Sequence, residues 1–212
     1  MELTTLLNLY KNESIAVMQE MDLDSIARLT ELVLDCYHTG SQFFACGNGG
    51  NAAYVANLIT DLNLHPFVSE NKAISIPHTK RFKGFNLCDS VSTITGILND
   101  VGSPLIFTSQ LEIYASKGDV LLGFSGSGNS ENIVNAFQYA KFKGMRTALI
   151  TRKQEGKIHH LSDVVVCVPG YSTYPGQTGG NNNNFHYEDM ISKISHMITG
   201  ILKKEVNENQ AK

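Results

Sequence analysis

Three serines stand within six residues in the stretch SGSGNS, residues 125–130. The stretch follows the apolar run DVLLGF and precedes the amphipathic run ENIVNAFQYAKF. The first turn of a helix has unpaired backbone N–H groups and a partial positive charge, so small residues there let an anion approach, and hydroxyls add neutral donors. Ser125, Ser127 and Ser130 therefore suit a phosphate-binding loop. A turn in which a serine caps the helix fits the same residues equally well.

A second loop of similar construction, CGNGGNA, begins at Cys46 and also joins an apolar run to a helical one. Neither loop has the lysine of a Walker loop or the full glycine spacing of a dinucleotide fingerprint. In an open parallel sheet, ligands bind beyond the carboxyl ends of the strands, where the loops of neighbouring strands meet. The two loops together predict one site for a compact phosphorylated ligand.

The elements that must position these loops are short apolar runs alternating with helical patterns, which predicts an α/β domain with a parallel sheet. The strand-like runs are QFFACG, KAISIPH (ending at His78), DVLLGFSG, RTALITR and VVVCVPG. We expect helices over residues 1–37, with a break near 21–24 and a cap at Asp24. Further helices are expected over 52–62, over 131–143 with a C-cap at Gly144, and over 187–204.

The length, net charge and composition of the chain restrict the class of protein. The chain has 212 residues and a formal net charge of −3, so we expect one domain and no nucleic-acid partner. No apolar stretch approaches the roughly 20 residues that a membrane helix needs, so we expect a soluble, cytoplasmic protein. The segment 171–185 reads as a long mobile loop and 205–212 as a frayed polar tail. His159 and His160 are expected on the surface, and buried reduced thiols are expected at Cys36, Cys46, Cys88 and Cys167.

Four segments make the chain resemble the SIS (sugar isomerase) family, and within it the phosphoheptose isomerases. They are GNGGNA at 47–52, GILNDVG at 96–102, GDVLLGFSGSGNSENIVNA at 118–136 and AKFKGMRTALIT at 140–151. Those enzymes convert sedoheptulose 7-phosphate to a manno-heptose 7-phosphate. The resemblance implies a flavodoxin-like three-layer fold, in which helices flank a five-stranded parallel sheet. It also implies a homotetramer, with the N-terminal helices packed in the oligomer and active sites at subunit interfaces.

The resemblance also implies which residues hold the sugar phosphate. The phosphate ligands are Ser125, Ser127 and Ser130, with Gly126 standing where the isomerases have a threonine. Two further parts of the chain match positions that face the sugar: the first loop, in which Asn51 replaces a serine, and Asp100 of LNDVG. The implied binding set is Asn48, Gly49, Gly50, Asn51, Asp100, Ser125, Gly126, Ser127, Ser130 and Glu188. The implied base is Asp61, at a glutamate position, and the implied acid is His196.

Helical spacing agrees with these two assignments. Asn57 and Asp61 are four residues apart, opposite the apolar face of 52–62. In the last helix, Glu188 and His196 lie off the expected core stripe, which is formed by Met190, Ile191, Ile194, Met197, Ile198 and Ile201. Either both polar faces are simply solvated, or they form a shared site at an interface; the resemblance favours the interface site.

Many of the isomerases bind zinc at positions that hold Asn57, Asp61, Glu188 and His196 in this chain, and only the histidine is unchanged. Carboxylates and imidazole are zinc ligands, so Asp61, Glu188 and His196 form a candidate Zn²⁺ set. Phe185 stands at a sugar-facing aspartate position. The leading hypothesis is a phosphosugar aldose–ketose isomerase. The alternatives are a SIS protein without catalysis, which senses a sugar phosphate or serves as an oligomeric adaptor of the replication-initiator-binding type, and a SIS etherase or isomerase of another sugar.

Overall fold

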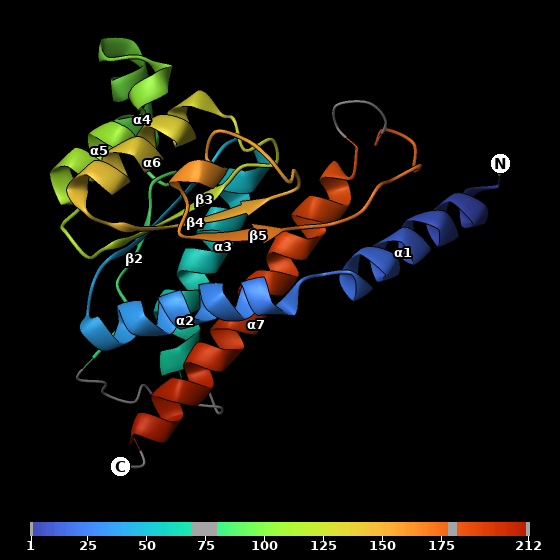
Figure 1. Cartoon of the computed structure of the whole chain (residues 1–212), viewed down its shortest axis with the longest axis horizontal. Helices are drawn as coiled ribbons and strands as arrows, with labels where there is room; N and C mark the ends of the chain where they lie inside the picture. The colour runs from blue at the N-terminus through green and yellow to red at the C-terminus, as the bar shows by residue number, and fades with distance from the viewer. Residues whose placement is uncertain (1, 69–79, 178–181, 211–212) are drawn as a thin grey trace.

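The computed structural model describes residues 2–68, 80–177 and 182–210. Its centre is a parallel five-stranded sheet in the order β2-β1-β3-β4-β5 (Figure 1). The strands are β1 (Phe43–Gly47), β2 (Gly84–Asn86), β3 (Val120–Phe124), β4 (Arg146–Thr151) and β5 (Val164–Cys167). This strand order is that of the flavodoxin-like folds, so the predicted fold class is confirmed.

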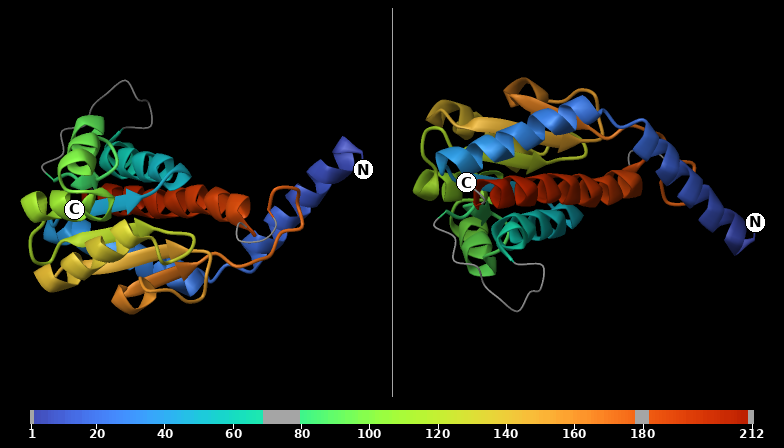
Figure 2. Two further views of the ribbon diagram at one scale, coloured as in Figure 1. Left: turned by 90° about the horizontal axis from the view of Figure 1, so that it is seen from above. Right: turned by 90° about the horizontal axis from the view of Figure 1, so that it is seen from below.

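Helices cover both faces of the sheet, which gives three layers (Figures 1 and 2). One face is covered by α2 (Leu23–Thr39), α3 (Gly50–Leu64) and α7 (Asn184–Gln210). The other is covered mainly by α5 (Thr108–Tyr114) and α6 (Glu131–Lys143), with α4 (Val91–Asp100) beside them. Alternate residues of β1 point to opposite faces, so Phe43 packs in the first core and Phe44 in the second. None of the helices in the described ranges is both long and apolar enough to cross a membrane.

Most predicted elements form where the sequence places them, and α6 ends at Gly144 in the left-handed conformation (φ 78°). Strand β2 was not predicted, because three residues with an exposed Phe85 carry no periodic signal. The predicted strand KAISIPH, with His78, lies outside the described residues. The described residues also form three short 3₁₀ turns, which are η1 (His65–Phe67), η2 (Ser103–Leu105) and η3 (His159–Leu161).

Several boundaries differ from the prediction. Asp22 caps α2, not Asp24, because its carboxylate accepts from the backbone N–H groups of Asp24 and Ser25. Helix α7 continues to Gln210, so most of the expected polar tail is helical, and Val206 within it is only 1 % exposed. The core stripe of α7 passes through buried Leu202 rather than through Ile201, which is 44 % exposed. All four cysteines are free, but only Cys36 and Cys46 are fully buried.

Helix α1 (Leu3–Gln19) projects away from the sheet and carries the N-terminus at its tip (Figures 1 and 2). Glu13 joins this arm to the segment after β5 and to α7. Its carboxylate accepts from Ser172 Oγ (2.6 Å), Thr173 N and Oγ1 (both 2.8 Å) and His186 Nε2 (3.0 Å). Burial alone would raise the pKa of Glu13, but these hydrogen bonds lower it to about 2.

The segment expected to be a long mobile loop is packed in its described part, and α7 begins within it, at Asn184. Ser172, Gln177 and Asn183 are each no more than 2 % exposed. Asn183 donates to the carbonyls of Pro169 and Gly170, and Gln177 Oε1 accepts from Phe185 N. The polar composition that suggested an open loop instead satisfies internal hydrogen bonds.

We expect Glu13→Gln to lower the free energy of unfolding by up to about 3 kcal/mol near neutral pH. Because the folded pKa is depressed, the charged carboxylate stabilises the native state above pH 4.5 and loses that contribution as the pH falls towards 2. Urea unfolding at a series of pH values measures the difference between wild type and variant, which should shrink across that interval. Glu20→Gln, at the exposed end of the same helix, is the control; if it matched Glu13→Gln, the predicted anchoring would be wrong.

We expect Gly123→Ala to destabilise the protein by about 1–3 kcal/mol, because an added methyl overpacks the interface between β3 and α6. A Cβ at Gly123 would lie 2.6 Å from Phe137 Cε2 and 3.1 Å from Ile133 Cγ2. Gly200→Ala in α7 is the matched control, since its Cβ would meet no atom within 4 Å, and it should stabilise the chain by up to about 1 kcal/mol. Denaturant unfolding measures both; effects of the same sign would contradict this packing.

Candidate functional site

The two small-residue loops leave neighbouring strands at the same edge of the sheet. Gly47, the last residue of β1, pairs with Phe124, the last residue of β3. Helix α3 then covers one face and α6 the other, so a crevice opens between the loops, where ligands bind in folds of this type. Asn48 and Asn132 join the loops through two reciprocal side-chain hydrogen bonds, of 2.9 and 2.8 Å. A hollow of about 250 Å³ lies beside them, lined by Asn48, Ser103, Pro104, Ser130, Glu131 and Asn132.

The serine loop keeps its hydroxyls at the start of α6. Ser130 occupies the N-cap position of α6, all of whose residues the structure describes, but its side chain makes no capping hydrogen bond to the helix. Ser125 Oγ instead lies 3.3 Å from Ser130 Oγ, and Ser127 Oγ accepts from Asn129 N (3.2 Å). Of the two interpretations of this stretch, the arrangement argues against the simple helix cap, and the phosphate-binding loop stays a prediction.

Residues after β4 donate hydrogen bonds to the serine loop. Ile158 N donates to Gly128 O (3.0 Å), and Lys157 N donates to Asn129 Oδ1 (2.9 Å). Gly128 has φ +67°, and a Cβ there would lie 2.9 Å from Cε1 of His159. His159, expected on the surface, is therefore half-buried against the loop. Sequence reasoning missed this because the contact joins segments about thirty residues apart.

The first loop is partly filled by the protein's own carboxylate. Glu188 Oε2 would lie 3.1 Å from a Cβ on Gly50, the first residue of α3, and Glu188 Oε1 accepts from Asn184 Nδ2 (3.1 Å). A carboxylate is favourable at a helix N-terminus, but it disfavours a phosphate there. The start of α6 is therefore the better of the two positions for an anion. Within the described part of the chain, Asn51 Oδ1 is buried with no hydrogen-bond donor.

Asp61 and His196, the predicted base and acid, lie side by side although 135 positions separate them. His196 Nε2 is 3.6 Å from Asp61 Oδ2, with side-chain exposures of 62 % and 27 %. Asn57 Nδ2 donates to the same carboxylate oxygen (3.2 Å). Among the residues that the structure describes, no hydrogen bond or ion pair joins Asp100 to this pair. It is exposed at the end of α4, where its side chain accepts a hydrogen bond from Asn99.

The Asp61–His196 pair is far along α7 from the serine loop. That loop meets α7 at Tyr187, whose Cε1 would be 3.5 Å from a Cβ on Gly126. His196 follows nine residues later, which is about 13 Å along the helix axis. The chain therefore presents two polar groups, one at the sheet edge and one on the outer surface of α3 and α7.

The candidate Zn²⁺ set does not assemble within one chain. Glu188 lies beside Gly50, about 12 Å along α7 from His196, and only Asp61 and His196 come together. In the described ranges, no three His, Cys, Asp or Glu side chains lie close enough to hold a metal ion. At position 57 a zinc site would need a stronger ligand than an amide, and the Asn57 amide already donates to Asp61. The residues of a single chain thus do not fit this metal.

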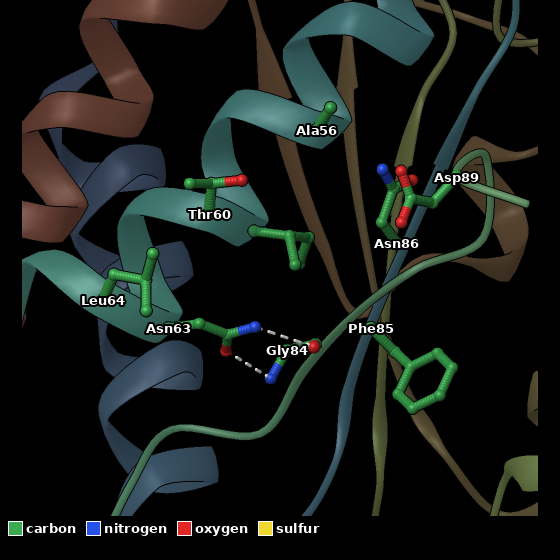
Figure 3. A pocket seen from close by; sticks show the side chains of 9 residues that line it. Ala56, Thr60, Asn63, Leu64, Gly84, Phe85, Asn86 and Asp89 are labelled. Atoms are coloured by element: carbon green, nitrogen blue, oxygen red, sulfur yellow. Dashed lines mark hydrogen bonds between the residues drawn. The ribbon is translucent and has the colours of Figure 1, made fainter.

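A larger hollow, of about 400 Å³, lies between α3 and β2 (Figure 3). It is lined by Ala56, Ile59, Thr60, Asn63, Leu64, Gly84, Phe85, Asn86 and Asp89, none of which was predicted as a site residue. Asn63 pairs with both backbone polar groups of Gly84 (2.8 and 3.0 Å) and so anchors the short edge strand (Figure 3).

Comparison with known proteins gives the same family for sequence and fold. Residues 10–152 match the family model described as SIS domain. The phosphoheptose isomerase of Aliarcobacter butzleri is 32 % identical over 195 residues, which cover 92 % of this chain and 93 % of that protein. The phosphoheptose isomerase of Vibrio cholerae serotype O1 is 31 % identical over 189 residues, or 87 % and 86 % of the two chains.

Among solved structures, phosphoheptose isomerase GmhA from Neisseria gonorrhoeae superposes with a TM-score of 0.79 at 24 % sequence identity. The superposition covers 96 % of this chain and all of that one, so the fold is shared from α1 to α7. The crevice between the β1 and β3 loops, the family match and the relatives lead to one assignment. The chain belongs to the SIS domain family and is homologous to phosphoheptose isomerases over most of its length.

Proposed function

We propose that this protein is an aldose–ketose isomerase of a phosphorylated sugar, with sedoheptulose 7-phosphate as the first substrate to test. The observation that carries the proposal is the 3.6 Å contact between Asp61 and His196, a carboxylate and an imidazole on different helices. The homology to phosphoheptose isomerases and the uncapped serine loop support it.

The reaction moves one proton between adjacent carbons and another between their oxygens, so it needs a base near carbon and an acid near oxygen. In this proposal Asp61 takes the proton from C1 of the ketose and returns it to C2. His196 donates a proton to the C2 oxygen and accepts the one released from the C1 oxygen. Ser125, Ser127 and Ser130 hold the phosphate, and the buried Asn51 Oδ1 accepts from a sugar hydroxyl.

We infer further that each site is shared between two copies of the chain. In a fully extended sedoheptulose 7-phosphate, seven bonds of about 1.5 Å separate C2 from phosphorus, so the distance is at most about 10 Å. Tyr187, where the serine loop meets α7, and His196 lie about 13 Å apart along the helix, which exceeds that distance, so we infer that the serine loop and the histidine of one site come from different chains. The projecting arm α1 also exposes Leu3, Leu7 and Ile15, an apolar surface that a second copy would cover.

We expect His196→Ala to lower kcat with sedoheptulose 7-phosphate by about 100-fold or more, the usual contribution of a general acid. Asp61→Asn should do the same, because an amide cannot accept the carbon-bound proton. Both variants should keep the wild-type Tm. An NMR assay that follows conversion of the ketose, with and without added Zn²⁺, measures turnover. His38→Ala is the matched control, since it removes another exposed His–carboxylate pair, with Glu205 at 3.1 Å.

The same assay separates the alternatives. Wild-type protein that gains Tm with the sugar phosphate but shows no turnover would point to another substrate or to a sensor. Neither turnover nor a Tm shift would contradict the proposal and favour the oligomeric adaptor. Full activity in His196→Ala would remove the assigned acid.

A mixture of two inactive variants tests the shared site. We expect Ser127→Ala and His196→Ala, unfolded and refolded together, to regain about a quarter of wild-type activity, since one site in four then combines an intact serine loop with an intact histidine from its neighbour. Each variant refolded alone is the control. No recovery, with mixed oligomers shown by mass spectrometry, would place the whole site in one chain.

A further inference from the structure

Arg152, the first residue after β4, lies against the serine loop. A Cβ on Gly126 would lie 3.2 Å from Arg152 Nε and 3.5 Å from its Cδ, so the arginine occupies the space into which a side chain at position 126 would extend. Arg152 N donates to Gly126 O (3.4 Å), and Arg152 Nη1 donates to Asn182 O (2.8 Å). The backbone N–H of Arg152 and its Nη1 atom thus both hold the residue beside the loop.

The charges around this loop call for a cation if a phosphate binds. The serine hydroxyls and the backbone N–H groups are neutral donors. Glu131 lines the adjoining hollow and Glu188 lies at the start of α3, so two carboxylates would repel a phosphate dianion. Burial raises the pKa of Tyr187, the charge of Glu188 raises it further, and the charge of Arg152 lowers it. Both charged groups therefore lie near the Tyr187 ring, and Cε1 of that ring would be 3.5 Å from a Cβ on Gly126.

We propose that Arg152 is an anion-binding residue of the serine loop and supplies the positive charge for the phosphate where Gly126 has no side chain. The inference rests on the proposed function, because it assigns a residue to the same site. A guanidinium is planar and always charged, and its N–H groups match the spacing of phosphate oxygens. Sequence reasoning missed Arg152, although it is the last residue of the predicted strand run RTALITR, and the carboxyl end of a parallel strand is where a binding residue can stand.

The test measures binding of inorganic phosphate to the full chain by calorimetry in a phosphate-free buffer at several NaCl concentrations. We expect Arg152→Ala to weaken binding at least tenfold and to reduce its dependence on salt. Arg152→Lys should restore part of the affinity, because it keeps the charge but loses the planar fork. Lys153→Ala is the matched control: it removes an adjacent charge that is exposed, and it should change affinity less than twofold.

Ser127→Ala separates the inference from the function on which it rests. If Ser127→Ala weakens phosphate binding while Arg152→Ala leaves both affinity and salt dependence unchanged, the assignment of Arg152 is wrong and the phosphate loop stands. If wild-type protein binds no phosphate, both are wrong. If Arg152→Lys binds no better than Arg152→Ala and salt dependence is unchanged in both, Arg152 only supports Asn182, and the proposal is overturned.

Discussion

The parallel pairing of β1 with β3 is the constraint on which the site depends. The two strands are in register from Phe43 and Val120 to Gly47 and Phe124, and both are buried on both faces. Their loops therefore start at the same level and turn to opposite faces of the sheet. The amide pair of Asn48 with Asn132 across the crevice follows from that register.

Small residues then set how closely other groups approach. Gly123 lets Phe137 of α6 pack directly on the sheet, which fixes where the first turn of α6 begins. Gly50 admits the Glu188 carboxylate to the start of α3, and Gly126 admits Arg152 to the serine loop. The two glycines thus admit a carboxylate to one loop and a guanidinium to the other, and this difference favours an anion at the start of α6 over one at the start of α3.

The length of α7 links the sheet edge to the outer surface. One end meets the serine loop at Tyr187 and the arm at His186, and the Asp61–His196 contact lies further along the same helix. Glu13 joins α1 to the start of α7 through its hydrogen bond with His186, and the Asp61–His196 contact lies on the same helix. The arm and the serine loop thus meet α7 at the same end, nine or ten residues before His196.

The sequence by itself determined most of the strands, the longer helices and their faces, but not β2, α4 (Val91–Asp100) or α5 (Thr108–Tyr114). Apolar runs located four of the five strands, and four-residue spacing placed Asn57 with Asp61 on the polar face of α3, because these signals are periodic and local. Gly144 ended α6 as expected. The two serine and glycine loops were also recognisable, since their composition and their position between a strand and a helix lie within a few residues of one another.

Only the tertiary structure decided which of these residues meet. The contact of Glu13 with His186 joins residues 173 positions apart, and that of Asn48 with Asn132 joins residues 84 apart. Neither has a local signature, because a hydrogen bond between distant segments depends on sheet order and helix crossing rather than on neighbouring residues. Strand β2, the packed segment after β5 and the place of Arg152 beside Gly126 depend in the same way on what the rest of the chain brings alongside them.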